Sequence, residues 1–224
     1  MKQRLPAFSL RILWLCFMVG GFFCGGVLLL VPAYAAAAPD KSLSAILERI
    51  SSAAENVVTV SSRMEQEKHL RVFDEVLKAS GRFAFQRPDC WRWELYEPVK
   101  SGLAVCGGHG RRWHENSGEV KRFKLADEPW LQHFAAQVTA WTTADFAFLQ
   151  AQYKITLQRQ NPPTLKLVPQ EAAARQLISS LEISFSADCR YVEQIVIREA
   201  DRDYTVIKFL EVTINKPLPS DHFD

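Results

Sequence analysis

Cys106, His109 and His114 are the residues whose types most readily suggest chemistry, because thiolate and imidazole groups bind zinc or act together as nucleophile and base. Their spacing matches no zinc pattern, and neither a fourth ligand nor a third, orienting residue is evident. The surrounding Cys106-Gly107-Gly108-His109-Gly110 fits a long hairpin turn and lacks the Gly-Lys-Ser/Thr step of a phosphate loop. A Gly-x-Ser-x-Gly motif is also missing from the sequence. We therefore predict that the protein is not an enzyme and uses no metal ion or other cofactor.

Three cysteines follow the first 35 residues: Cys90, Cys106 and Cys189. Cys90 and Cys106 flank a predicted hairpin, so their strands should be neighbours and a disulfide between them is one possibility. Cysteines on neighbouring strands often fail the distance requirements of a disulfide, so two free thiols are the alternative. Cys189 lies in a predicted turn, and we expect it to be unpaired.

The N-terminal segment has the features of an export signal. Basic residues precede the apolar run 12–31, and Ala33-Tyr34-Ala35 offers a small-x-small cleavage site. The run is long enough for a membrane anchor, but its glycines and the alanine-rich exit favour cleavage near Ala35. We thus expect a signal peptide over residues 1–35 and one exported domain over residues 36–224.

The charge of that domain excludes one class of partner. The formal net charge is +2 for the whole chain, and removing the three positive charges of the signal leaves −1. A nearly neutral domain lacks the basic footprint of a nucleic-acid-binding protein, so we predict no nucleic-acid partner.

Strand patterns dominate the rest of the chain. A first helix is predicted after a cap at Asp40 or Ser42, with apolar residues at helical spacing from Leu43 to Ile50. The short turns between the strands that follow require antiparallel pairing, and a sheet of about eleven strands should curl. Alternating apolar residues between turn signals predict these strands at about 57–66, 72–86, 91–96, 102–106, 111–115, 120–125, 153–158, 164–168, 181–185, 191–198 and 204–214.

A helical segment at about 128–149 interrupts the strands, which gives the order of an α+β fold. Thr142 together with Asp145 is expected to form a cap at which a helix restarts, leading to Phe146. An apolar stripe on the first helix must be buried, and the concave face of the sheet is the available partner. The stripe consists of Trp130, Phe134, Val138 and Trp141.

The segment 81–94 is the most specific motif. Period-two alternation places Trp91, Trp93 and Leu95 on one face of a strand that follows the step Arg87-Pro88. Glycine, alternating apolar residues, Arg-Pro and then Trp-Arg-Trp-Glu resembles the signature of the periplasmic outer-membrane lipoprotein carrier (LolA) family.

Two other segments extend the resemblance over about residues 40–224. Met64-Glu65-Gln66 is similar to an aromatic-x-Gln strand of the family, with Met64 in place of the aromatic residue. The segment 212–218, followed by Phe223, is similar to the closing strand and Asn-x-Pro-Leu exit. The Gly-rich turn 106–110 departs from the family, because it is a longer version of a short Asp-Gly turn.

The resemblance implies an open half-barrel of about eleven strands, closed by a helical lid at about 128–149 over an apolar cavity. It implies a soluble periplasmic carrier that shields the acyl chains of lipoproteins between the inner and outer membranes. An inner-membrane loading complex and an outer-membrane acceptor are the implied partners, and we expect the carrier to be a monomer. Arg87 would act as a latch that bonds the backbone of the lid when the cavity is empty. The expected cavity residues are Met64, Arg87, Trp91, Trp93, Leu95, Leu103, Val105, Trp130, Phe134, Val138, Trp141 and Phe146.

Two other functions remain open at this point. The cargo could be a non-protein lipid or a pigment-like acyl molecule, which would fit the altered Gly-rich turn. Alternatively, the same fold could serve as a membrane-tethered scaffold if the signal is not cleaved.

Overall fold

The structure is a computed structural model that describes residues 41–72, 76–219 and 222–223. The predicted signal peptide, the cap at Asp40 and part of the second predicted strand (73–75) lie outside the described residues. The predicted first helix is confirmed as α2 (Lys41–Glu55), which buries Ile46, Leu47 and Ile50.

In the described part of the chain, eleven antiparallel strands form one open sheet, with β6 and β7 at its two edges and β1 paired to β11 in the middle. This confirms the predicted fold class. The sheet order is β6-β5-β4-β3-β2-β1-β11-β10-β9-β8-β7. The strands are β1 (Thr59–His69), β2 (Val76–Gln86), β3 (Cys90–Glu97), β4 (Ser101–Cys106), β5 (His109–His114), β6 (Glu119–Lys124), β7 (Tyr153–Gln160), β8 (Pro163–Pro169), β9 (Ile178–Phe185), β10 (Val192–Glu199) and β11 (Tyr204–Ile214).

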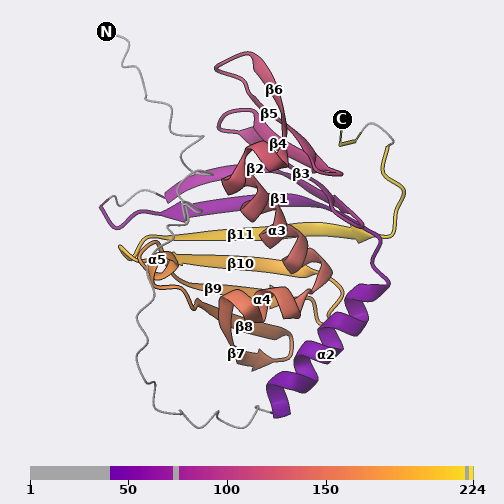
Figure 1. Ribbon diagram of the computed structural model, residues 1–224, viewed down its shortest axis with the longest axis vertical. Coiled ribbons are helices and arrows are strands. Elements are labelled where there is room, and N and C mark those ends of the chain that lie inside the picture. The colour runs from indigo at the N-terminus through magenta and orange to yellow at the C-terminus, as the bar shows by residue number, and fades with distance from the viewer. Residues whose placement is uncertain (1–40, 73–75, 220–221, 224) are drawn as a thin grey trace.

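The helical segment between β6 and β7 covers one face of this sheet (Figure 1). It consists of a short 3-10 helix, η1 (Leu125–Asp127), then α3 (Pro129–Thr143) and α4 (Phe146–Gln152). α3 ends because Ala144 is left-handed, with φ 55°. The Asp145 carboxylate then accepts a 3.0 Å hydrogen bond from the Phe148 backbone N–H and caps α4. The predicted restart is confirmed, but Thr142 lies inside α3 and takes no part in the cap.

Two short helices, η1 and α5, were not predicted from the sequence. α5 (Ala172–Arg175) is a single turn between β8 and β9. Three or four residues are too few to show a helical period, so helices this short leave no pattern of apolar residues in the sequence.

A disulfide joins Cys90 at the start of β3 to Cys106 at the end of β4, which decides between the two alternatives left by the sequence. Cys189 forms no disulfide, as expected, and its buried sulfur accepts a 3.1 Å hydrogen bond from Arg49 Nε.

The core lies between the inner face of the sheet and the helices. Alternate residues of each strand point inward, so the register brings Ser62, Phe83 and Trp93 side by side across β1, β2 and β3. α2 packs along one end of the sheet and touches α3, where Ser51 Oγ donates to the Ala144 carbonyl at 3.3 Å (Figure 1). These contacts position α3 over the middle of the sheet.

Candidate functional site

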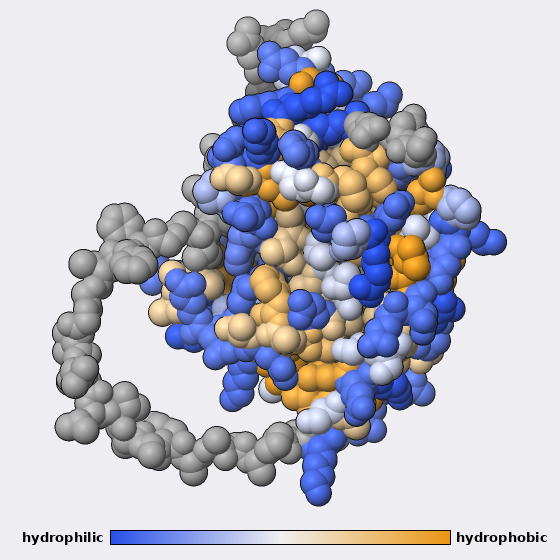
Figure 2. All heavy atoms as spheres, turned by 45° about the vertical axis from the view of Figure 1, so that its right-hand side comes forward, coloured by the Kyte–Doolittle hydropathy of each residue, from blue (hydrophilic) through white to orange (hydrophobic). Residues whose placement is uncertain are grey.

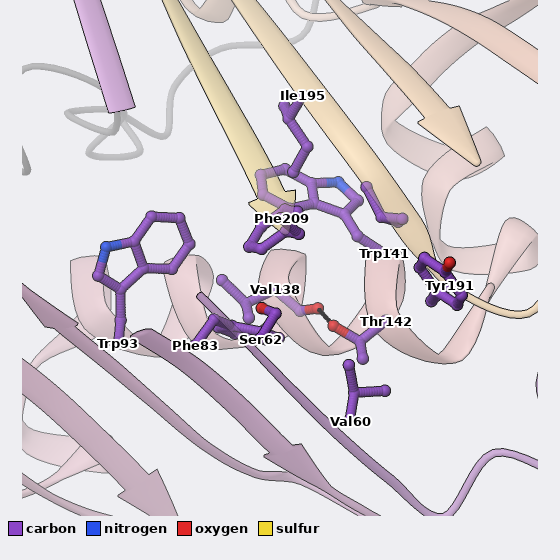
Figure 3. Close-up of a pocket in the computed structure, with 11 residues that line it drawn as sticks. Val60, Ser62, Phe83, Trp93, Val138, Trp141, Thr142, Tyr191, Ile195 and Phe209 are labelled. Atoms are coloured by element: carbon purple, nitrogen blue, oxygen red, sulfur yellow. Dashed lines mark hydrogen bonds between the residues drawn. The ribbon is translucent and has the colours of Figure 1, made fainter. Parts of the chain in front are cut away.

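An apolar cavity lies between α3 and the inner face of the sheet. Three aromatic rings form a cluster on one wall: Phe83 lies 5.3 Å from Phe209 and 5.9 Å from Trp93 between ring centroids. Figure 3 shows the side chains of the sheet facing Val138 and Trp141 of α3 across this space. The lining residues are Val60, Ser62, Phe83, Trp93, Val138, Trp141, Thr142, Tyr191, Val192, Ile195 and Phe209.

The cavity is small in this structure. Its volume is about 30 Å³, which is room for two or three water molecules, whereas ligand pockets usually measure about 300 to 1,000 Å³. The space under α3 is therefore about one tenth of the smallest usual ligand pocket. On the face shown in Figure 2, apolar side chains form a strip flanked by hydrophilic ones, so the core is partly open to solvent there.

Three of the predicted site residues line the cavity: Trp93, Val138 and Trp141. Met64 and Trp91 are fully buried nearby, and the Trp91 ring stacks edge-on against Phe134 with 5.5 Å between centroids. Trp91 is thus packed in the core beside the cavity and does not line it.

The other predicted residues extend the apolar face without touching the cavity. Leu95, Leu103 and Val105 are buried on β3 and β4. Phe146 packs against Phe185 with 6.4 Å between centroids. Trp130 is half-buried at the start of α3, where its indole N–H donates to Glu128 at 3.2 Å.

Arg87 binds one carbonyl in the last turn of α2 and one just beyond that helix, and not the backbone of the segment 128–149 that was expected to be the lid. Its Nε donates to the Val57 carbonyl at 2.8 Å, and Nη2 donates to the Ala54 carbonyl at 2.9 Å. The reason is the chain path: the Arg87 backbone N–H pairs with the Val58 carbonyl, directly after the end of α2. The guanidinium therefore holds the end of α2 to the end of β2 through charge-assisted bonds, and the Ala54 carbonyl accepts a second hydrogen bond from the Val57 backbone N–H at 3.0 Å.

Several lining residues were missed by the sequence analysis. Phe83 and Phe209 could have been found from strand register, since Phe83 pairs with Trp93 and Phe209 pairs with Met64. Tyr191 and Val192 lie near the turn between β9 and β10, and their place beside α3 has no local sequence signal.

Polar contacts fix one side of α3. The fully buried Gln137 accepts a hydrogen bond from the Tyr153 hydroxyl at 3.3 Å and donates to Gln152 Oε1 at 2.7 Å. Burial raises the pKa of Tyr153 to about 12. Thr142, which lines the cavity, instead donates within α3 to the Val138 carbonyl at 2.8 Å.

The residues first considered for metal or thiol chemistry do not form such a site. The Cys106 sulfur is bonded to Cys90, so it is available neither as a thiolate ligand nor as a nucleophile. His109 and His114 lie at the two ends of β5; His109 is exposed and its ring bonds the Gly107 carbonyl at 3.1 Å, whereas His114 is partly buried. Among the described helices, none combines the length and apolar character that a membrane crossing requires.

Several solved structures are similar to this chain. An uncharacterized conserved protein from Thermus thermophilus superposes with a TM-score of 0.51 at 10% identity, covering 82% of this chain and 93% of that one. The lipoprotein LppX of Mycobacterium tuberculosis gives a TM-score of 0.48 at 10% identity, covering 83% and 100%. A LolA superfamily protein from Nitrosomonas europaea gives 0.43 at 10% identity, covering 81% and 96%. A search of curated protein sequences gives no match.

The sequence itself carries the decisive similarity. Residues 55–224 match the family described as outer membrane lipoprotein carrier protein LolA, which includes every strand and α3. Proteins of this family are periplasmic carriers and not enzymes. This chain belongs to the LolA family.

Proposed function

We propose that the protein is a periplasmic carrier that shields the acyl chains of lipoproteins during their transfer from the inner to the outer membrane. Each methylene exposed to water costs about 0.8 kcal/mol, so one long acyl chain carries a penalty on the order of 10 kcal/mol. The observation that supports a carrier most strongly is the apolar cavity between α3 and the sheet in a chain of this family. A loading complex in the inner membrane and an acceptor at the outer membrane are part of the same proposal.

The closed cavity fits a carrier that must also release its cargo. Its wall is aromatic and aliphatic, and α3 covers it through apolar contacts and the Gln137 hydrogen bonds. Lifting α3 would replace its contacts with the sheet by contacts with acyl chains. Both states then bury similar apolar surface, so the net free energy of binding stays low enough for unloading.

Mass spectrometry of lipids and lipoproteins that co-purify with the exported protein tests this function. We expect lipoproteins or their acylated N-terminal peptides in about equal molar amount to the carrier. Val138→Glu places a carboxylate in the cavity, and Gln132→Glu adds the same charge to an exposed site of the same helix as a control. Only Val138→Glu should lose the cargo, because a buried carboxylate must be desolvated against the acyl chains.

A second variant covers the case in which Val138→Glu fails to fold. Val138→Phe fills the cavity without adding charge and should also reduce the cargo, with folding checked by thermal melting. Co-purification of a free lipid without lipoprotein would reject the lipoprotein client in favour of a lipid carrier. Equal cargo in wild type and both cavity variants would contradict a carrier that uses this cavity.

A further inference from the structure

The hairpin of β5 and β6 is strongly basic, although the domain as a whole is almost neutral. Residues 109–124 contain five basic and two acidic side chains, whereas the formal net charge of the exported domain is −1. In Figure 1 this hairpin forms the upper edge of the sheet and projects beyond the helices. The five basic residues are Arg111, Arg112, Lys121, Arg122 and Lys124. A concentration of one charge sign at an exposed edge attracts partners of the opposite sign.

The strand register divides these charges between the two faces of the hairpin. Residues that pair across neighbouring strands share a face, and Arg112 pairs with Lys121. Both side chains approach the Glu128 carboxylate just before α3, at 3.6 Å and 3.8 Å. The inner face, on the side of α3, therefore has an acidic residue that balances part of its charge.

The outer face of the hairpin has no such balance. Within residues 109–124, Glu119 shares the inner face and Glu115 lies in the turn, so no acidic side chain points outward. Arg122 and Lys124 are exposed, and neither forms an ion pair with any residue in the described part of the chain. The outward side chains are His109, Arg111, Trp113, Val120, Arg122 and Lys124.

Two apolar side chains accompany these charges on the outer face. Trp113 pairs with Val120, and the exposed fraction of Val120 is 57%. The indole lies flat over Gly102, which leaves no room for a side chain beneath the ring. The guanidinium groups of Arg92 and Arg111 lie 4.8 Å and 5.1 Å from its centroid. Basic groups beside an aromatic ring and an exposed aliphatic residue are typical of surfaces that meet lipid head groups.

We propose that the outer face of the β5–β6 hairpin binds the surface of a membrane that contains anionic phospholipids. Arg122 and Lys124 would lie against the phosphate groups, with Val120 at the level of the head groups. The contact needs no groove, because the charges act on the surface potential of the bilayer. Lysines on an edge strand disfavour the addition of a further strand, which argues against a peptide paired to β6. This inference goes beyond the carrier function, because it concerns the membrane surface and not the cargo.

Flotation of the purified exported protein with phospholipid vesicles tests the inference. Vesicles of phosphatidylcholine alone are compared with vesicles that contain equal parts of phosphatidylcholine and phosphatidylglycerol. We expect the wild type to float only with the anionic vesicles at about 0.05 M salt. Binding should be largely lost at about 0.5 M salt, because the charges are then screened over a few ångströms.

Charge-reversal variants assign the binding to the outer face. Each basic residue near an anionic surface strengthens binding roughly fivefold, so Arg122→Glu and Lys124→Glu should each lower the partition coefficient by roughly five- to 25-fold. Arg122→Gln only removes a charge and should lie between wild type and Arg122→Glu. Lys154→Glu, at an exposed position of the opposite edge strand β7, makes the same change in net charge and is the control. Thermal melting checks that all variants fold.

The possible outcomes separate this inference from the carrier function. Failure of the wild type to bind anionic vesicles, or equal losses in Arg122→Glu and Lys154→Glu, would overturn the membrane contact. Capture by immobilised poly-L-glutamate without vesicle binding would assign the face to an acidic polypeptide and also overturn it. Arg122→Glu should retain the cargo of the wild type. A wild type that binds anionic vesicles but carries no cargo would reject the carrier function and leave the membrane contact in place.

Discussion

At the scale of single residues, Arg87 ties the end of α2 to the sheet through one guanidinium. Its two hydrogen bonds, to the carbonyls of Ala54 and Val57, join segments separated by 33 and 30 positions in the sequence. Hydrogen bonds from a charged donor are stronger than those from a neutral donor. The planar guanidinium of arginine can also donate to two acceptors at once in a fixed geometry. The contact lies on α2, which in turn touches the end of α3 through Ser51.

We predict that Arg87→Leu lowers the free energy of unfolding by about 2 to 4 kcal/mol, because two carbonyls lose charge-assisted bonds. Urea denaturation measures the change. Arg87→Lys keeps the charge but not the forked donors, so its stability should fall between those of the wild type and Arg87→Leu. Since α2 contacts α3, cargo transfer to an acceptor should also slow in Arg87→Leu. Wild-type stability and transfer in this variant would show that the guanidinium has no latch role.

Some residue-scale features follow from the sequence and others do not. Trp93 on the inner face follows from period-two alternation, and Val138 with Trp141 follows from the helical stripe. The hydrogen-bond acceptors of Arg87 cannot be predicted in this way, because they depend on where α2 lies in the fold. The same holds for the buried ion pair between Lys68 and Glu199, whose charged atoms are 2.6 Å apart although the residues are separated by 131 positions.

At the scale of elements, α3 is the element that a bound acyl chain would have to displace. Its length and apolar face were predictable, since proline opens it and the stripe continues to Trp141. The width of the cavity could not be predicted from the sequence, because it depends on how closely α3 packs on the sheet. The hydrogen bond between Gln137 of α3 and Tyr153 could not be predicted from the sequence either, since neither residue belongs to a motif.

The ionisation of Tyr153 should make the free energy of unfolding depend on pH in the alkaline range. Burial raises the pKa of Tyr153 to about 12, against about 10 in an unfolded chain. The folded protein therefore holds this proton more tightly, and the contribution is complete below pH 10 and lost as the pH rises towards 12. The loss over this range should be about 2 to 3 kcal/mol of unfolding free energy.

Tyr153→Phe should remove this alkaline loss and cost about 1 kcal/mol near neutral pH, where Gln137 loses its donor. Urea denaturation at pH 7, 9 and 11 separates the two effects. The same slope between pH 9 and 11 in wild type and variant would mean that Tyr153 is not the group responsible.

At the scale of the whole molecule, the chain is a single open sheet whose first and last strands pair in the middle, with α3 over the concave face (Figure 1). The closed form has a cavity of about 30 Å³, far smaller than an acyl chain. A carrier with this cavity therefore needs two states of one molecule: an empty form with α3 packed down and a loaded form with α3 lifted.

The distance between α3 and the sheet, measured with and without an acyl ligand, tests this requirement most directly. Spin labels at Gln132, exposed on α3, and Lys78, exposed on the outer side of β2, report it by pulsed electron resonance. We predict that saturation with 1-palmitoylglycerol lengthens the mean distance by about 4 Å or more, the thickness of one added layer in van der Waals contact. An unchanged distance distribution at saturating ligand would contradict the account, because the acyl chain would then be bound without lifting α3.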